Sequence, residues 1–349
     1  ASLVPDVGGG TITLISWSGR LASMSDHFLG CDPRAAMASH NCFFVMFIFG
    51  PLGPEAIGGI WGTSTGLYDK FGGDRVIDTP ISESAIIGAA GGLGLTGKRP
   101  VAEIMFADFL GVCMDQSWNQ MAKFRYMFGG KTECPAVVRM IYGAGLNAAA
   151  QHSQAPHGIL TSMPGLKVVM PSTPADAKGL LTTAIRDQDP VIFLEHKALY
   201  AEKGEVPEGE YTIPFGHARL AHAGEDVTIV AAGLMVKFAT KAAQGLAEQG
   251  IGCDVIDLRT TSPLDEEAIL DSVENTGRLV VVDESPPRCG LATDIVSLVT
   301  NKAYASLKAP PEMVTSPHTP VPFARELEKA YLPSPGKIAD AVQRTLAWK

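Results

Sequence analysis

Residues 227–258 read VTIVAAGLMVKFATKAAQGLAEQGIGCDVIDL, and this stretch decides the fold class. Val227–Ala231 is a short apolar run typical of a buried strand. Met235–Gln249 has the apolar spacing of a helix that ends at Gly250, and Cys253–Leu258 is a second apolar run. Two buried strands joined by a helix predict parallel pairing, because a parallel connection needs a crossover segment of this length.

The alternation continues on both sides of this unit. It predicts an α/β chain with two doubly wound parallel-sheet domains, covering residues 58–200 and 216–349 and joined by a Glu-, Gly- and Pro-rich linker at 201–215. The expected strands are Pro100–Phe106, Ala136–Ile141, Val191–Leu194 and Leu279–Asp283, and the expected helices are Asp108–Tyr126, Thr173–Arg186, Leu264–Asn275, Leu291–Leu307 and Pro335–Trp348. Residues 1–57 show no clear helical period, although Cys42–Phe49 is apolar enough for a buried strand and too short to span a bilayer.

Composition excludes several classes of protein. The chain has 349 residues, 46% of them hydrophobic, so it can bury a large core. The net charge of −9 argues against nucleic acid or an anionic membrane as a partner. The six cysteines are scattered, without metal-ligand spacing, and are expected to be reduced core residues. With no secretory signal at the N-terminus, these features predict a cytoplasmic protein.

A carboxylate stands where an apolar strand meets a helix of small residues, in Asp78-Thr79-Pro80-Ile81-Ser82-Glu83. Apolar neighbours would keep Glu83 poorly hydrated, which favours its neutral form and suits proton exchange near neutral pH. The alternative is a helix N-terminus, because Thr79 and Ser82 both cap well and a first-turn glutamate suits the helix dipole.

A histidine with polar neighbours is the second candidate, in Gln151-His152-Ser153-Gln154. It follows a loop of small residues, and the flanking amides and hydroxyl could fix the tautomer of His152. A hydrogen-bonded surface loop is an equally good interpretation. The other histidines of this part of the chain are expected to be structural or solvated, namely His157, His196, His217, His222 and His318.

Three further patterns carry less chemical information. Ala184, Asp187 and Asp189 could place a carbonyl and two carboxylates around a hard cation, or simply form a polar turn. Gly92–Gly97 fits the GxGxxG pattern but ends a helix instead of opening one, so close packing and a C-terminal cap explain it better. Gly62–Gly66 fits GxSxG but lacks the strand and the acid–histidine pair of a nucleophile elbow.

Phosphate-binding motifs are missing from the sequence. It contains no GxxxxGK[ST] loop, and no GDG segment followed by an asparagine that could hold a metal-bound diphosphate. If the chemistry uses a diphosphate cofactor, another polypeptide must bind that end.

Taken together, these segments resemble the β-subunit of the thiamine-diphosphate-dependent first component of the 2-oxo acid dehydrogenase complexes. The resemblance covers residues 58–349. The matching pieces run in family order and are GGIWGTSTGLYDKFG (58–72), DTPISE (78–83), FRYMFGG (124–130), QHSQ (151–154), PGLKVV (164–169) and DLRT (257–260). The segments SESAIIG (82–88) and FADFL (106–110) are most similar to the acetoin dehydrogenase branch of the family. The pyruvate and branched-chain dehydrogenase branches are the alternative.

The resemblance implies roles for the candidate residues. Glu83 would hydrogen-bond the aminopyrimidine nitrogen of thiamine diphosphate, and Phe109 would pack on the pyrimidine ring. His152 would orient the substrate and assist transfer of the acyl group to a lipoyl arm. Ala184, Asp187 and Asp189 match a potassium-binding turn of some relatives.

The resemblance also implies partners. An α-subunit would supply the diphosphate and Mg²⁺ end of the cofactor in an α2β2 heterotetramer, and a lipoyl acyltransferase core would dock on the assembly. Residues 1–57 depart from the family pattern, because the expected Gly-Glu-Asp is replaced by Phe49–Glu55, and Glu55 could stand in for the missing carboxylate. The alternatives are a transketolase-like half that transfers ketol groups and a non-catalytic assembly subunit.

Overall fold

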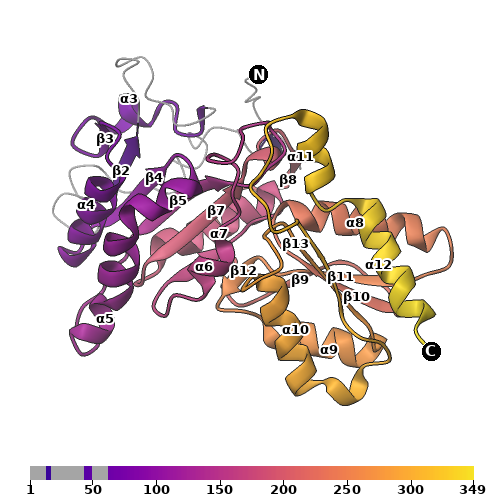
Figure 1. Ribbon diagram of the computed structural model, residues 1–349. Helices are drawn as coiled ribbons and strands as arrows, with labels where there is room; N and C mark the ends of the chain where they lie inside the picture. Colours follow the sequence, from indigo (N-terminus) through magenta and orange to yellow (C-terminus); the bar gives the residue numbers. More distant parts are fainter. Residues whose placement is uncertain (1–12, 17–42, 49–61) are drawn as a thin grey trace.

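The computed structural model describes residues 13–16, 43–48 and 62–349, and Glu55 lies outside them. Two mostly parallel sheets, each flanked by helices, lie side by side (Figure 1). Buried apolar side chains of both sheets belong to one continuous core, so the two halves pack directly on each other. The predicted α/β class with two parallel-sheet domains is confirmed.

The first sheet has seven strands, and every neighbouring pair is parallel except the edge pair β12–β6. Strand β12 comes from the C-terminal half of the chain, so the second half completes the sheet of the first. In sheet order the strands are β12 (Thr260–Ser262), β6 (Lys167–Val169), β7 (Val191–His196), β5 (Val137–Tyr142), β4 (Arg99–Ile104), β2 (Phe43–Ile48) and β3 (Val76–Thr79).

The helices of this half differ in regularity. Thr173 caps α7 as expected, since its side chain accepts a bond from the Asp176 amide and Pro174 takes the first helical position. The predicted single helix Asp108–Tyr126 is instead a succession of short helical pieces. The elements are α3 (Leu67–Phe71), α4 (Glu83–Leu95), the 3₁₀ turn η3 (Ala107–Cys113), the π-helical η4 (Asp115–Gln120), η5 (Met121–Lys123), α5 (Phe124–Met127), α6 (His157–Thr161), α7 (Pro174–Arg186) and η6 (Lys197–Leu199).

The second sheet has five strands, of which only the edge strand β9 is antiparallel to its neighbour. In order they are β14 (Glu312–Thr315), β13 (Leu279–Asp283), β10 (Val227–Ala231), β11 (Cys253–Asp257) and β9 (Arg219–His222). Helices α8 and α12 pack together on this sheet, and α9 packs with α10 (Figure 1). The helical elements are α8 (Leu234–Ala247), α9 (Glu266–Thr276), α10 (Leu291–Lys302), η7 (Tyr304–Ser306), α11 (Arg325–Tyr331) and α12 (Pro335–Ala347).

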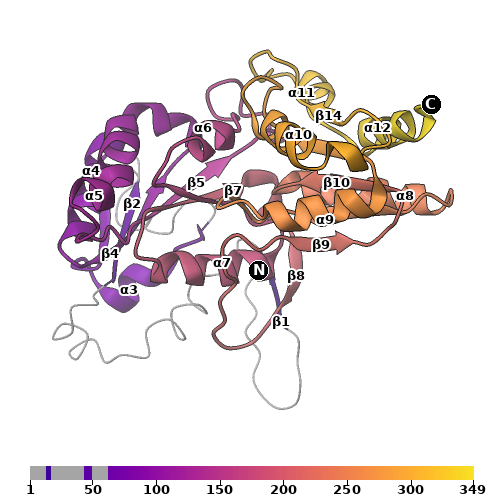
Figure 2. The same cartoon turned by 90° about the horizontal axis from the view of Figure 1, so that it is seen from below.

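The segment between the two sheets is partly ordered by pairing. Strand β8 (Lys203–Val206) lies antiparallel to β1 (Thr13–Ser16), and Figure 2 shows the two side by side. Ile213 then packs on Gly179 of α7, where an added Cβ would lie 2.6 Å from the isoleucine side chain. The predicted linker is therefore attached to the first half of the chain along much of its length.

The two pattern matches that were discounted have structural explanations. Gly94 packs so closely on Cys134 that an added Cβ would lie 3.1 Å from the sulfur, and Gly97 has φ +81° just after α4. These glycines serve packing and helix termination, as expected. Ser64 of the GxSxG match is fully buried ahead of the five-residue helix α3.

The cysteines confirm the prediction only in part. Among the described residues Cys113, Cys134 and Cys253 are buried free thiols, and burial raises the pKa of each to about 12. Cys289 is exposed, because it lies in the loop between β13 and α10, so the expectation of a core position is wrong there. Within the described part of the chain, every helix is too short or too polar to cross a bilayer.

Candidate active site

Glu83 is the first residue of α4, directly after the turn that follows β3. Its side chain is only 8% exposed, although Ile81 of the same turn is 66% exposed and contributes little to that burial. Ser82 occupies the N-cap position, but its hydroxyl donates to the Pro80 carbonyl (3.0 Å) and caps no helical amide. Capping by Ser82 therefore does not explain this turn, and Glu83 remains a buried carboxylate near the positive end of a helix.

The 3₁₀ turn η3 packs on the start of α4, next to Glu83. The Ser84 hydroxyl donates to the Val112 carbonyl at 2.6 Å, which ties the start of α4 to η3. Cys113 lies close enough that the charge of Glu83 adds to burial in raising the pKa of its thiol. Among residues 62–349, no donor is bonded to the Glu83 carboxylate, so its oxygens can accept a hydrogen bond from a bound molecule.

Phe109 and His152 come together although they are 43 positions apart in the sequence. The ring centroids lie 5.3 Å apart with the planes at 78°, and a second edge contact, 4.9 Å at 79°, joins His152 to Phe106. Phe109 lies in η3 and Phe106 is the N-cap residue of the same element, which also packs on the Glu83 helix. Two aromatic edges therefore fix the plane of the His152 ring beside the region that holds Glu83.

Lys197 is a residue of this site that the sequence analysis missed. It is 3% exposed, its ammonium donates to the His152 carbonyl and to the Ser153 hydroxyl (3.2 Å), and it lies 5.6 Å from the Phe106 ring centroid. Burial lowers the pKa of Lys197, and the nearby charge of Asp108 opposes that shift. Its only sequence signal is a lysine directly after the buried strand β7, where a solvated side chain is the ordinary expectation.

Asp108 holds the other side of the histidine loop. Its Oδ1 accepts bonds from the Gln154 amide (3.0 Å) and from the Gln154 side chain (2.9 Å). The flanking amide that the sequence suggested as a histidine partner thus bonds Asp108 instead. The backbone that directly follows the His152 ring is therefore anchored by Lys197 and Asp108.

Two buried histidine–acid pairs join the halves of the chain behind this loop. His157 Nε2 lies 2.7 Å from Asp283, and His196 Nε2 lies 2.7 Å from Glu284. Burial disfavours the charge on both members of the first pair, but their mutual attraction outweighs it, so the pKa of His157 is raised and that of Asp283 is lowered. These histidines are structural, as expected.

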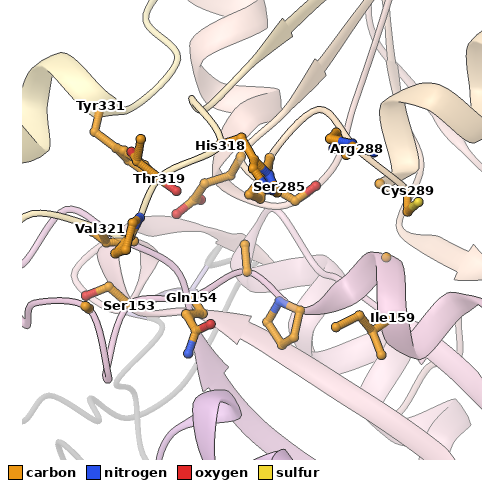
Figure 3. A pocket seen from close by; sticks show the side chains of 18 residues that line it. Ser153, Gln154, Ile159, Ser285, Arg288, Cys289, His318, Thr319, Val321 and Tyr331 are labelled. Atoms are coloured by element: carbon orange, nitrogen blue, oxygen red, sulfur yellow. The ribbon is translucent and has the colours of Figure 1, made fainter.

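A cavity of about 450 Å³ opens between the two halves next to these pairs (Figure 3). Ser153 and Gln154 of the histidine loop line one side, and Ser285, Arg288 and His318 line the other. The cavity lies beside the histidine loop, but neither Glu83 nor Phe109 lines it. It is therefore separate from the region that holds Glu83 and Phe109.

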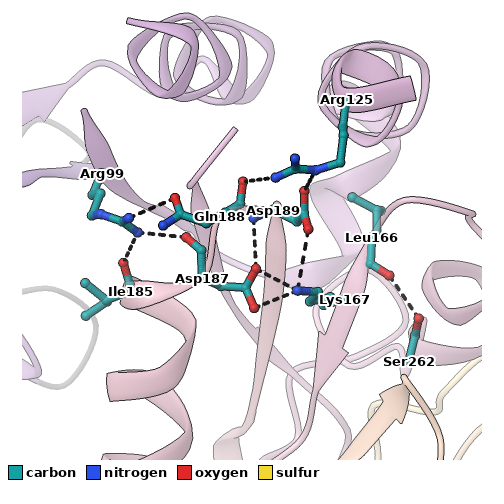
Figure 4. Close-up of polar contacts among 9 residues, drawn as sticks. All are labelled: Arg99, Arg125, Leu166, Lys167, Ile185, Asp187, Gln188, Asp189 and Ser262. Carbon is teal, nitrogen blue, oxygen red and sulfur yellow. Dashed lines mark hydrogen bonds and ion pairs between the residues drawn. The ribbon is translucent and has the colours of Figure 1, made fainter. Parts of the chain in front are cut away.

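The polar turn at residues 184–189 is already neutralised by side chains of the chain itself (Figure 4). Both oxygens of Asp187 accept bonds from Lys167 (2.6 and 2.7 Å), and Asp189 is paired with Arg125. The Ala184 carbonyl accepts a bond from the Asp187 amide (3.3 Å). In the described part of the chain no group of three acidic, histidine or cysteine side chains is arranged to hold a metal. This donor set does not fit an added metal ion well, because each oxygen already has a partner.

The domain models and the relatives agree with this architecture. Residues 51–203 match the transketolase pyrimidine-binding domain, and residues 216–338 match the transketolase C-terminal domain. The acetoin:2,6-dichlorophenolindophenol oxidoreductase subunit beta of Cupriavidus necator is 59% identical over 84% of this chain and 86% of the relative. This chain belongs to the dehydrogenase β-subunit family.

Two further relatives and one solved structure are also similar to this chain. The Bacillus subtilis protein with the same acetoin name is 55% identical, over 84% of this chain and 85% of that relative. The pyruvate dehydrogenase E1 component subunit beta of Bacillus subtilis is 45% identical, over 83% of this chain and 89% of that relative. A solved structure described as a split gene transketolase, inactive beta4 tetramer, superposes with a TM-score of 0.73 at 21% identity, covering 96% of this chain and 99% of that one. That likeness shows the fold alone.

Proposed function

We propose that this dehydrogenase β-subunit belongs to an acetoin dehydrogenase, which cleaves acetoin with thiamine diphosphate and passes the acyl group to lipoamide. The observation that supports acetoin as the substrate is the difference in sequence identity between this chain and its relatives. Those named for acetoin are 59% and 55% identical to this chain, whereas those named for pyruvate and 2-oxoisovalerate are 45% and 42% identical. Pyruvate and a branched 2-oxo acid are the alternative substrates.

Glu83 is the proposed catalytic carboxylate. When bound, thiamine diphosphate supplies a carbon nucleophile and an electron sink for cleavage beside a carbonyl group. Glu83 suits the pyrimidine end of that cofactor, because a buried carboxylate with free oxygens can hold a proton on a ring nitrogen. Phe109 lies half-buried on the neighbouring η3, where its ring can pack on the pyrimidine.

His152 is proposed to act on the acyl group. Its ring is only partly buried, and its plane is set by the edges of Phe106 and Phe109, so its nitrogens are presented in one orientation. A histidine held in this way can move a proton to or from the sulfur or oxygen that takes part in acyl transfer to a lipoyl arm.

An α-subunit is the proposed partner, holding the diphosphate and Mg²⁺ in an α2β2 assembly that docks on a lipoyl acyltransferase core. Large apolar side chains are exposed on the Glu83 turn, η3, η4 and α5, and they support a covering partner, since exposed apolar surface often marks a protein–protein contact. They are Ile81, Val112, Trp118, Tyr126, Met127 and Phe128.

The potassium role of Ala184, Asp187 and Asp189 stays a prediction. Lys167 and Arg125 already neutralise the two carboxylates, so we derive no chemical step from a metal there. A thermal midpoint of the assembly that is the same in potassium and tetramethylammonium buffers would argue against this role, and a specific rise in potassium would support it.

The test is a reconstituted αβ pair assayed on acetoin, pyruvate and a branched 2-oxo acid, with 2,6-dichlorophenolindophenol or lipoamide as the acceptor. Acetoin is expected to give the highest kcat/KM, and a higher value for either 2-oxo acid would overturn the substrate assignment. The His152→Ala variant is expected to keep its affinity for thiamine diphosphate and to lose lipoyl acylation. Unchanged acylation kinetics in that variant would refute the role of His152.

A further inference from the structure

The loop between β5 and His152 has a regular alternation in its backbone. Every second residue has positive φ, with values of 94° at Gly143, 107° at Gly145, 55° at Asn147 and 59° at Ala149. Alternation of left-handed residues with others turns successive N–H groups to one concave side, which is a common way for a backbone to bind an anion. The loop is therefore shaped to bind negatively charged groups.

Two carboxylates from the C-terminal half occupy that concave side. The Ala144 amide donates to Glu284 Oε1 at 2.6 Å. The amides of Gly145 and Asn147 both donate to Glu328, each at 2.9 Å. Glu284 and Glu328 are only 4% and 3% exposed, so these charge-assisted bonds are shielded from water.

The second oxygen of Glu284 is also committed. His196 Nδ1 accepts a bond from the Ala198 amide at 3.1 Å, so Nε2 is the nitrogen that donates to Glu284 Oε2. Gly143 is pressed against this ring, because an added Cβ would lie 2.1 Å from His196 Nε2. One carboxylate of the second half thus joins the loop to the end of strand β7.

The far end of the loop is fixed from the first half of the chain. Lys197 donates to the His152 carbonyl, and Asp108 accepts from the Gln154 amide. The His152 ring therefore extends from a backbone that is held on both sides, and the upstream attachments come from the C-terminal half.

We propose that Glu284 and Glu328 are positioning residues that set the His152 loop for acyl transfer, so that the C-terminal half controls the active site without touching substrate. This inference rests on the role proposed above for His152. Proton transfer requires the donor and acceptor atoms within hydrogen-bond reach, and a shift of about 1 Å in a catalytic group can lower the rate by about 10²-fold.

The charge and shape of the carboxylates can be tested with amides of the same size. In Glu284→Gln the single amide oxygen can accept a bond from either the Ala144 N–H or the His196 N–H. The N–H group that is left without this acceptor then faces the NH₂ group of the glutamine. Glu328→Gln loses one of the two acceptors that face the amides of Gly145 and Asn147. Glu326→Gln is the matched control, because Glu326 lies on the same helix α11 but is exposed.

The experiment uses the αβ holoenzyme carrying each variant. We expect Glu284→Gln and Glu328→Gln to retain affinity for thiamine diphosphate while kcat for lipoyl acylation falls by about 10²-fold. Glu326→Gln is expected to match the wild type. Acylation unchanged in both buried variants would overturn the proposal.

A double-mutant cycle separates positioning from general destabilisation. In a His152→Ala background, Glu284→Gln is expected to add no further loss, because the group it positions is absent. A further loss equal to that in the wild-type background would overturn the proposal.

Hydrogen exchange gives a readout that does not depend on activity. The amides of Ala144, Gly145 and Asn147 are expected to exchange faster in the buried variants and at the wild-type rate in Glu326→Gln. If His152→Ala leaves acylation unchanged, the proposed function fails, and these exchange rates still decide whether the carboxylates order the loop. Unaltered exchange in the buried variants would refute the proposal that Glu284 and Glu328 order the loop.

Discussion

Glu195→Ala tests the energetics of the first sheet, where a charged cluster crosses three buried parallel strands. Arg139 of β5 donates three bonds to Glu195 of β7, at 3.1, 3.0 and 2.7 Å, and its second neighbour, Glu103 of β4, lies at 3.7 Å. The side chains of Arg139 and Glu195 are only 4% and 7% exposed. The variant removes the nearer partner of a guanidinium that remains charged, because an arginine side chain does not lose its proton in proteins.

The size of the effect follows from the charge left behind. Breaking a buried ion pair by removing one partner typically costs about 3–5 kcal/mol. Since Glu103 remains within reach of Arg139, the lower part of this range applies, about 3 kcal/mol. Glu195→Gln keeps a hydrogen-bond acceptor and is expected to cost about half as much. Glu202→Ala is the control, because the Glu202–Lys237 pair is largely exposed and pairs of that kind contribute about 1 kcal/mol or less.

The assay is urea unfolding of each variant at one protein concentration, since partner association contributes to the apparent stability. The midpoint is expected to fall most for Glu195→Ala, less for Glu195→Gln and least for Glu202→Ala. A midpoint for Glu195→Ala equal to that of Glu202→Ala would refute the argument that burial makes the Arg139 pair important.

Three further outcomes follow from the structure. Gly143→Ala is expected to displace His196 and lower activity and thermal midpoint together, because the new Cβ would lie 2.1 Å from the ring; a wild-type midpoint would contradict this. His157 has a raised pKa when folded, so its contribution to stability is complete below its unfolded value of 6.5 and is lost as pH rises through the folded value. The stability of His157→Gln should therefore fall less than that of wild type as pH rises above 6.5, and parallel curves would contradict the linkage. Iodoacetamide at pH 8 is expected to label exposed Cys289 and to spare Cys113, whose pKa is about 12, as peptide mass spectrometry can check.

The regular part of the fold could be predicted because local patterns and tertiary structure agree there. The sequence predicted strands at Val227–Ala231 and Leu279–Asp283, and both have these bounds in the structure. The edge strand Thr260–Ser262 could not be predicted, because three residues carry no period and its partner β6 is about 90 positions away. The apolar spacing of Asp108–Tyr126 predicts one helix, but spacing does not reveal whether the hydrogen bonds are of α, 3₁₀ or π type.

For the candidate site, the sequence predicted residues that lie near one another, but it did not predict the residues that anchor the loop around them. Phe109 and His152 were named separately, and the structure brings their rings into contact. Lys197, Glu284 and Glu328 were missed, because a buried charge has no sequence signature when its partners are backbone groups of a distant loop. Such contacts depend on the packing of the two halves.

We propose that Glu83 holds a proton on the pyrimidine of thiamine diphosphate bound between this chain and an α-subunit. The most direct measurement is the rate of hydrogen–deuterium exchange at the thiazolium carbon of the bound cofactor, compared between wild type and Glu83→Ala in intact αβ assemblies. Exchange in the variant is expected to slow by at least about 10²-fold while the assembly persists. Exchange at the wild-type rate in an assembly that still binds the cofactor would contradict it.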